Sequence, residues 1–343
     1  MVSIKDVARE AGVSVSTVSR VIRENGYVAQ EKKELVLETI KRLNYSPSAV
    51  ARSLVSRQSK LVGMVISTVQ SPFLTGLLAG CEEILKQNGY MISILHTHEN
   101  PEIEAEAVRK LLSWRVDAII SCPSFNCPPS VYEAAAQQIP VVFVGRYLAV
   151  KNAHSIESDN VNGAKKAMDY LVELGHRRII LLNGPLCIST SVGRWCGVQQ
   201  SIEENNLDRD QLIIRFCNNT VQGGYEAMMD IFRTVAPLPT AVYCDNNQLA
   251  AGVFKACEQA GILVPHRLSV AAYDGFDDTV LGDVIRPHVT ANIHPSALMA
   301  EMAANMVLEA CRDRESWKQS PRHTVLPLEF RVRESTAPPA QTF

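Results

Sequence analysis

Residues 4–22 read IKDVAREAGVSVSTVSRVI, and this stretch decides the fold of the N-terminal part of the chain. Its apolar residues recur at the spacing of one helical face, at Ile4, Val7, Ala8 and Ala11. Gly12 then favours a turn, and Ser14 is a good N-cap for a second helix that continues through Ile22. With a third helix expected over about 31–44, the pattern predicts a small all-α headpiece.

Two short helices joined through a glycine are compatible with a helix-turn-helix, but many small helical bundles contain such a pair. The second helix favours DNA binding, because its outward positions include no acid that would repel phosphates. These positions are Val15, Ser16, Arg20 and Arg23. Eleven of the 34 Lys and Arg but only six of the 36 Asp and Glu lie in residues 1–60, so this stretch carries +5 and the remainder −7. The first 60 residues can therefore face a polyanion, whereas the remainder would repel one.

From residue 61 onward, short apolar runs alternate with helical stretches, which is the pattern of parallel sheets wound with right-handed crossovers. One series runs from LVGMVIS (61–67) to VVFVG (141–145), and a second begins at RRIILL (177–182). The two series predict two similar α/β lobes, with a ligand cleft at the carboxyl ends of the strands. The expected segments are a helix-turn-helix headpiece, a hinge helix with linker, a two-lobed effector-binding and dimerisation domain, and a disordered tail, over 1–46, 47–60, 61–336 and 337–343.

The composition is that of an ordinary globular protein, with 46% hydrophobic and 20% charged residues. No run of about 18 uncharged apolar residues occurs, so no membrane span is expected. Charges within the first six residues argue against an export signal, so we expect a cytoplasmic protein associated with the nucleoid. The nine cysteines include no CxxC pair, and we expect reduced, mostly buried thiols, with no metal site and no cofactor.

The headpiece sequence closely resembles that of the LacI/GalR family of bacterial transcription regulators, and SPSAVARSL (46–54) resembles the hinge of that family. The similarity covers nearly the whole chain. It continues through SPFL (71–74), Arg115-Val116-Asp117, Asp159-Asn160, LGHRRI (174–179), Gly184-Pro185 with Arg194, and RVREST (331–336). The resemblance implies a DNA-binding headpiece followed by a two-lobed domain like that of periplasmic sugar-binding proteins.

By this resemblance, residues 15–22 form the recognition helix in the major groove, with Val15, Ser16 and Arg20 at the base-reading positions. An arginine can bond bidentately to guanine, a pair worth roughly 1–3 kcal/mol of discrimination, and a valine can contact a thymine methyl. Four further residues are expected to bind phosphates and so to fix the register, namely Lys5, Ser14, Thr17 and Ser19. Ordinary surface polarity is the alternative for Thr17 and Ser19.

The hinge segment has Ser46 as a candidate N-cap and Pro47 at the first helical position, followed by barely two turns of helix. A helix this short is marginal alone, so it should be ordered only against DNA or a second copy of itself. Family members insert a hinge leucine into the minor groove, and Leu54 holds that position here. Such wedges unstack a base step and bend the duplex. The alternative is that Leu54 is a linker residue packed on the sensor domain.

The resemblance also implies which residues contact the effector. They follow strands of the two lobes, at Phe73, Leu74, Arg194, Asn246 and Asp274. An aromatic face and side chains that bond to neighbouring hydroxyls suit a sugar-like polyol. A helix cap or turn is the alternative for Asp274, and a surface salt bridge is the alternative for Arg194.

The chain departs from the family pattern in the cleft. Asn246-Asn247 stands where the family usually has Asn-Asp, and Asp245 precedes it, so a carboxylate has moved or been lost. Arg146 follows a glycine that replaces a polar or acidic residue, and Ile188 replaces an arginine of the purine-sensing relatives. These changes argue against a purine. They predict a cleft of net positive charge, with Arg146 as a further effector contact and a sugar acid or sugar phosphate as the ligand.

Together these features predict a sequence-specific DNA-binding regulator, a repressor that binds a palindromic operator as a homodimer and responds to a sugar-like effector. A dimer is expected rather than a tetramer, because only APPAQTF follows Thr336. The main alternative is an effector-blind or architectural DNA-binding protein, and a pure ligand carrier conflicts with the basic headpiece. Catalysis is not expected, because the sequence has no nucleophile elbow, phosphate loop or metal-spaced His pair, although its eight histidines allow a Ser-His-acid set.

Overall fold

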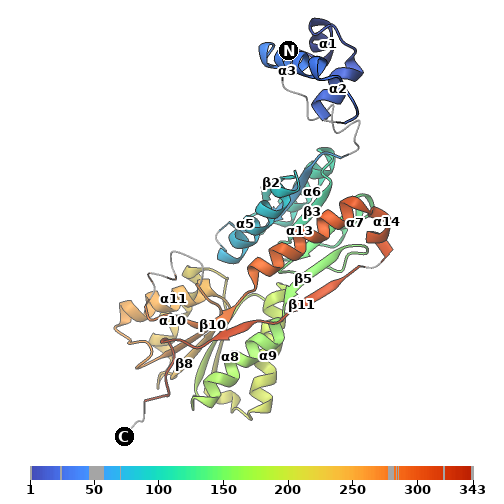
Figure 1. Ribbon diagram of the computed structural model, residues 1–343. Helices are drawn as coiled ribbons and strands as arrows, with labels where there is room; N and C mark the ends of the chain where they lie inside the picture. Colours follow the sequence, from blue (N-terminus) through green and yellow to red (C-terminus); the bar gives the residue numbers. More distant parts are fainter. Residues whose placement is uncertain are drawn as a thin grey trace. The chain divides into compact units, whose positions relative to one another are not determined.

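The computed structural model describes residues 2–23, 25–45, 58–69, 71–276, 282, 284, 286–319 and 321–340. The chain divides into two compact units, Met1–Lys60 and Leu61–Phe343, which are described separately (Figure 1). The predicted hinge helix and its Leu54 fall within residues 46–57, outside the described part of the chain.

The first unit is a three-helix headpiece. Its helices are α1 (Ile4–Glu10), α2 (Val15–Arg23) and α3 (Gln30–Arg42). Ser14 Oγ accepts the Thr17 N–H at 3.1 Å, so Ser14 caps α2 as predicted. The third helix ends two residues earlier than predicted, because Asn44 takes a left-handed φ of 48°. The buried core contains Val7, Ala8 and Ala11 of the predicted stripe, together with Val18 and Val21 of α2 and Val36 of α3.

The second unit contains two lobes, each built on a six-stranded sheet. The sheet of the first lobe has the order β11-β5-β4-β3-β1-β2, with parallel pairings. Its strands are β1 (Leu61–Ile66), β2 (Met91–His96), β3 (Ala118–Cys122), β4 (Val141–Val144), β5 (His154–Ser158) and β11 (His323–Leu326). One face is covered by α5 (Pro72–Gln87) and α13 (Ser296–Arg312), and the other by α6 (Pro101–Ser113) and α7 (Ser130–Gln138). The short α14 (Arg314–Gln319) follows α13.

The sheet of the second lobe has the order β12-β10-β9-β8-β6-β7 and is parallel except for the antiparallel β12. Its strands are β6 (Ile179–Asn183), β7 (Leu212–Phe216), β8 (Ala241–Cys244), β9 (Ser269–Asp274), β10 (Thr290–Ile293) and β12 (Glu329–Arg331). One face is covered by α8 (Asn160–Glu173) and α9 (Ser189–Glu204), and the other by α10 (Val221–Thr234) and α11 (Asn247–Ala260). A 3-10 turn, η1 (Arg209–Gln211), precedes β7. The predicted two-lobed α/β architecture with parallel sheets is confirmed.

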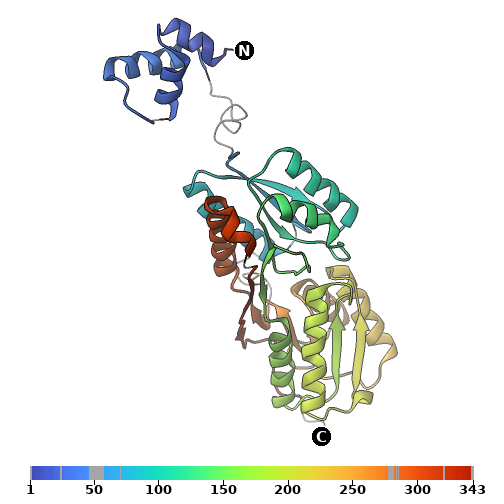
Figure 2. The same cartoon turned by 90° about the vertical axis from the view of Figure 1, so that its right-hand side faces the viewer.

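The chain passes between the lobes more than once (Figure 2). It leaves the first lobe from β5 into α8, returns from β10 into α13, and leaves again from β11 into β12. Residues 296–326 therefore belong to the first lobe, although they follow the second series of strands. These crossing segments start or end at the strand ends that border the cleft.

The C-terminal segment is anchored at a residue that the sequence assigned to a disordered tail. Ala337 N donates to Ser269 Oγ at 3.0 Å, and Ala337 O accepts the Ser269 hydroxyl at 2.9 Å. Ala337 O also lies 3.0 Å from His176 Nε2. The prediction that disorder begins at residue 337 is therefore wrong for Ala337, because the start of β9 and His176 both hold its backbone.

In the described ranges no helix is both long and apolar enough to cross a membrane. Five cysteines are buried, whereas Cys187 and Cys196 are exposed. Within the part of the chain that the structure describes, no group of three or more His, Cys, Asp or Glu is arranged to hold a metal ion.

Glu157 on β5 is a buried carboxylate whose ionisation costs stability. Its side chain is 12% exposed, and burial raises its pKa to about 7, even though His323 Nδ1 lies 3.5 Å from Oε1. An unfolded glutamate has a pKa of about 4.3. The folded protein therefore holds this proton more tightly, and stability falls as the pH rises from about 4.5 through 7.

We predict that Glu157→Gln raises the free energy of unfolding by about 1–3 kcal/mol at pH 8, because the glutamine has no charge to desolvate. The gain should shrink as the pH is lowered to 5, where the folded glutamate is already protonated. Denaturant unfolding at both pH values measures the effect, with the exposed Glu173→Gln as the control. An equal gain at the two pH values would contradict the assignment.

Candidate functional site

The predicted DNA contacts lie on the surface of the headpiece. Those whose side chains are exposed are Lys5, Ser14, Val15, Ser16 and Arg20, and those half-buried are Thr17 and Ser19. Ser14 Oγ lies 2.7 Å from Ser16 Oγ and 2.9 Å from Thr17 Oγ1. Three of the predicted hydroxyls thus form one cluster at the start of α2, and the N-terminus of a helix favours phosphate.

Tyr27 is a candidate DNA contact that the sequence reasoning missed. Its side chain is 91% exposed in the loop between α2 and α3. Gly26 before it has a φ of +84°, and a Cβ built on that glycine would lie 3.7 Å from Arg20 Cδ. The turn thus packs Gly26 against the side chain of the predicted base-reading arginine and leaves the next residue, Tyr27, exposed. The Asn25-Gly26 pair, a common turn signal, was the available clue.

A cavity of about 370 Å³ lies between the two lobes. All six residues predicted to contact the effector line it, namely Phe73, Leu74, Arg146, Arg194, Asn246 and Asp274. Most of the other lining side chains carry hydroxyls or amides, and they include Ser67, Thr68, Ser158, Asn160, Thr190, Asn219, Thr220, Gln222, Asn247 and Gln248. The positions follow from the fold, because parallel strands of both lobes end at the cleft.

Arg146 is paired on the first-lobe side of the cavity. Its Nη1 and Nη2 each lie 2.8 Å from a carboxylate oxygen of Glu99, and Nη1 also donates to Pro123 O at 2.8 Å. Glu99 Oε2 accepts the Phe125 N–H at 3.1 Å as well. Burial raises the pKa of Glu99, but the Arg146 guanidinium outweighs burial and holds that pKa below its ordinary value. The positive charge of Arg146 is thus compensated inside the protein.

Arg194 is buried on the second-lobe side. Its Nε donates to Asn160 Oδ1 at 3.2 Å, Nη1 donates to the Asp245 carbonyl, and Nη2 lies 3.5 Å from Asp274 Oδ1. The guanidinium also lies 3.7 Å from the centre of the Tyr273 ring, a favourable cation–π geometry. The surface salt bridge considered as the alternative for Arg194 does not describe this buried position.

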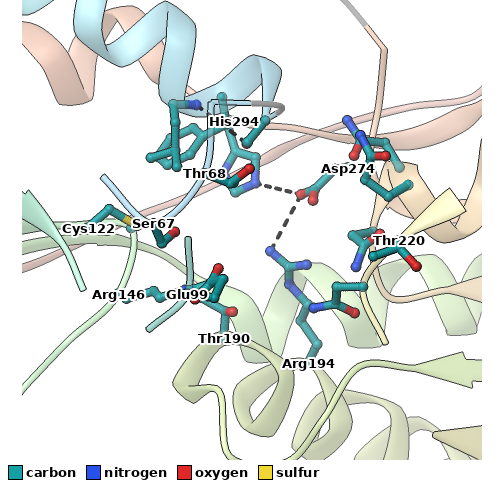
Figure 3. A pocket seen from close by; sticks show the side chains of 18 of the residues that line it. Ser67, Thr68, Glu99, Cys122, Arg146, Thr190, Arg194, Thr220, Asp274 and His294 are labelled. Atoms are coloured by element: carbon teal, nitrogen blue, oxygen red, sulfur yellow. Dashed lines mark hydrogen bonds and ion pairs between the residues drawn. The ribbon is translucent and has the colours of Figure 1, made fainter. Parts of the chain in front are cut away.

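Asp274 lies between Arg194 and a histidine that the sequence reasoning missed (Figure 3). His294 Nε2 is 2.6 Å from Asp274 Oδ1, and His294 Nδ1 is 2.8 Å from Ser158 Oγ. Burial raises the pKa of Asp274, but Arg194 and His294 outweigh it and lower that pKa. The His294 ring also lies 4.8 Å from that of Phe73. The sequence contains no clear signal for His294, because the strand before it, β10, reads TANI and is not an apolar run.

The Ser158, His294 and Asp274 side chains form the Ser-His-acid set that the sequence left open. Ser158 is 4% exposed and also contacts Met299 Sδ at 3.8 Å. The Asp274 carboxylate is already shared with the Arg194 guanidinium, so it stabilises a positive charge on the His294 ring less than an unshared carboxylate would. The chain of hydrogen bonds therefore fixes the orientation of Asp274 and joins strand β5 of the first lobe to strand β9 of the second.

Asp245 supplies the carboxylate that the family usually has one residue after Asn246. Its side chain is fully buried and Oδ2 accepts the Ser191 hydroxyl at 2.8 Å. Asn246 caps α11 by accepting the Leu249 N–H at 2.9 Å, which leaves its NH₂ group for a ligand. The cavity lining contains Glu99 and Asp274 against Arg146 and Arg194, with Asp245 behind it. The prediction that the cleft carries net positive charge is therefore wrong.

Comparisons with known proteins match the two units to two family models. The model described as bacterial regulatory proteins, lacI family, matches residues 3–48. The model described as periplasmic binding proteins and sugar binding domain of LacI family matches residues 59–333.

Among curated relatives, the chain is 32% identical to the HTH-type transcriptional repressor PurR of Haemophilus influenzae (strain PittEE), over 98% of both chains. It is 30% identical to the ribose operon repressor of Halalkalibacterium halodurans, over 98% of this chain and 97% of that protein. Among solved structures, the lac repressor dimer bound to operator and the anti-inducer ONPF superposes with a TM-score of 0.83 at 26% identity, over 98% of this chain and 99% of that one.

The Arg146–Glu99 pair predicts a measurable coupling. Each side chain is largely buried, so Arg146→Met or Glu99→Gln alone leaves a charge without its partner. We expect each single change to lower the free energy of unfolding, and the double change to cost less than their sum by about 1–3 kcal/mol. A double-mutant cycle in denaturant measures this difference, and additive effects would contradict the pairing.

Proposed function

Because the chain belongs to the LacI family of bacterial regulatory proteins, we propose that it is a repressor that binds a palindromic operator as a homodimer. Its affinity for the operator changes when it binds a sugar-like polyol without acidic groups. Its relatives are named as transcriptional repressors, and one is described as bound to operator as a dimer. The protein is a DNA-binding regulator under small-molecule control. It acts without catalysis, in the cytoplasm.

The effector class is inferred from the charged side chains of the cavity, because each arginine there is paired with a carboxylate. Arg146 is neutralised by Glu99, and Arg194 faces Asp274. An acidic ligand would find no free cation among the described lining residues and would meet two carboxylates. Hydroxyl and amide side chains line the remaining surface, beside the Phe73 ring. This lining supports a polyol whose hydroxyls replace hydrogen bonds to water and whose apolar face covers an aromatic ring.

The proposed DNA contacts divide into two kinds. Val15, Ser16 and Arg20 read base edges, while the hydroxyl cluster at the start of α2 binds backbone phosphate together with Lys5 and Ser19. Tyr27 adds an exposed aromatic ring in the turn after α2. Leu54 acts as the minor-groove wedge of the hinge.

An effector-blind architectural protein remains the second candidate for the chain. The cavity argues against it, since a protein without a ligand has no need for a hydroxyl-lined space of about 370 Å³ between its lobes.

We predict that Arg20→Ala weakens specific operator binding by about 10-fold to 150-fold, the equivalent of one lost bidentate base contact, and leaves non-specific binding nearly unchanged. Fluorescence titrations on operator and scrambled duplexes at one salt concentration measure both affinities. Lys41→Ala, an exposed basic residue on α3, is the control for loss of charge. Equal losses on both duplexes would make Arg20 a phosphate contact.

We predict that a neutral sugar stabilises the protein and changes its operator affinity about 5-fold to 150-fold. At 100 times its dissociation constant, such a ligand adds about 2.7 kcal/mol to the stability. Thermal unfolding with a panel of neutral sugars, sugar acids and sugar phosphates identifies the class. Asp274→Asn should lose the response but still bind operator. Tighter binding of the acidic members than of the neutral ones would contradict the proposal.

A further inference from the structure

Three neighbouring strands of the second lobe, β8, β6 and β7, end beside the cavity. The residues that follow them include Asp245, Gly184 and Asn219. A Cβ built on Gly184 would lie less than 3.0 Å from Asn219 Oδ1, Ser191 Oγ and Asp245 Oδ2. Three polar side chains therefore converge over the bare Cα of Gly184. We refer to these four residues, with Asn183, as the Asp245 corner.

The acceptors of the Asp245 corner outnumber its donors. Asp245 Oδ1, Asn183 Oδ1 and Asn219 Oδ1 are buried atoms without a hydrogen-bond partner among the described residues. The other oxygen of Asp245 accepts the Ser191 hydroxyl at 2.8 Å. Buried acceptors without donors are costly, so this corner suits a group that brings several donors and no acceptor.

The charged side chains of the second lobe also favour a ligand group that carries a positive charge. Arg194 is the cation that faces both Asp274, at 3.5 Å, and Asp245, at 4.0 Å. The guanidinium is thus shared by two carboxylates, of which Asp274 also has His294 as a partner. Burial raises the pKa of Asp245 and the Asp274 charge adds to this, while Arg194, the Ser191 hydroxyl and the Gly184 backbone N–H act against burial. A positive charge supplied by the ligand would favour the ionised form of Asp245.

The Asp245 corner is reached from the cavity through Asn219. Asn219 lines the cavity, together with Thr190 and Thr220, whereas Asp245 is fully buried. Asn219 Oδ1 and Asp245 Oδ2 both lie less than 3.0 Å from the same point above Gly184. Asn219 Oδ1 is itself a buried atom, so a ligand group contacts it and the Asp245 carboxylate only when the Asn219 side chain moves toward the cavity.

We propose that the Asp245 corner is an amine subsite of the effector cavity, and that the effector is an aminated polyol whose ammonium donates to Asn219 Oδ1 and pairs with Asp245. This inference rests on the proposed function of the cavity as the effector site. The hydroxyls of the same ligand face Asp274, Asn246 and the serine and threonine side chains of the lining.

An ammonium fits this corner better than a hydroxyl for two reasons. It has three donors and no acceptor, whereas a hydroxyl adds one donor and two further lone pairs to a corner already rich in acceptors. It also supplies the positive charge that Arg194 alone does not provide for two carboxylates. Hydrogen bonds between charged groups are roughly twice as strong as neutral ones, so the preference should be large.

The test uses the full-length protein and pairs of probes that differ only by an amine for a hydroxyl. Suitable pairs are glucosamine with glucose, galactosamine with galactose, mannosamine with mannose, and 1-amino-1-deoxysorbitol with sorbitol. Calorimetric titration at pH 7 gives each dissociation constant. We expect at least one amine to bind about tenfold or more tightly than its partner, and the same amine to change operator affinity.

Variants locate the effect. Asp245→Asn and Asn219→Ala should each remove the amine preference, and the exposed neighbour Asn218→Ala should retain it. Asn219→Ala serves where Asp245→Asn fails to fold, because Asn219 is only half-buried at the cavity wall.

If the hydroxyl compound of every pair binds as tightly as its amine, the amine subsite is overturned. The NH₂ group of Asn219 would then itself donate to Asp245. A panel in which nothing binds would overturn the ligand class. Neither result contradicts the DNA-binding function, because that function is tested separately by measuring operator binding in the same preparations. A response of operator affinity to neutral sugars alone would uphold the proposed function and reject this inference.

Discussion

The structure of the effector cavity depends on the hydrogen bonds and ion pairs of the buried Arg194 guanidinium. It joins the first turn of α8 through Asn160, the end of β8 through the Asp245 carbonyl, and the end of β9 through Asp274, while lying over the Tyr273 ring. A buried charge is tolerated only when it is paired and hydrogen-bonded, so these elements must keep their relative positions. The second-lobe wall of the cavity follows from that requirement.

The same network links the cavity to the segments that cross between the lobes. His294 lies where the chain leaves β10 for the first lobe, and it joins Asp274 to Ser158 at the end of β5, the strand from which the chain enters the second lobe. Its ring also contacts Phe73 at the start of α5. A ligand in the cavity meets groups from both lobes. It can shift the arrangement of the lobes only by as much as it binds one arrangement better than another.

The sequence predicted the parts of the fold that depend on local patterns. The stripe of α1, the cap at Ser14 and the alternation of strands and helices are short-range features, and the structure reproduces them. The cleft residues were reached only through the family resemblance. The pairing of Arg146 with Glu99 joins residues 47 positions apart, which no local pattern reveals. For that reason the cleft was predicted to be positive. His294 was also missed, and so was the full burial of Asp245.

The proposed function requires that the homodimer reads a palindromic DNA site and that the effector cavity controls that reading. A footprint of the purified protein on fragmented DNA from its own source, at physiological salt, with and without a mixture of neutral and aminated sugars, tests this claim most directly. We expect discrete palindromic sites whose occupancy changes with the mixture. Uniform, salt-sensitive coating of the DNA, with no preferred site and no response to the mixture, would contradict it.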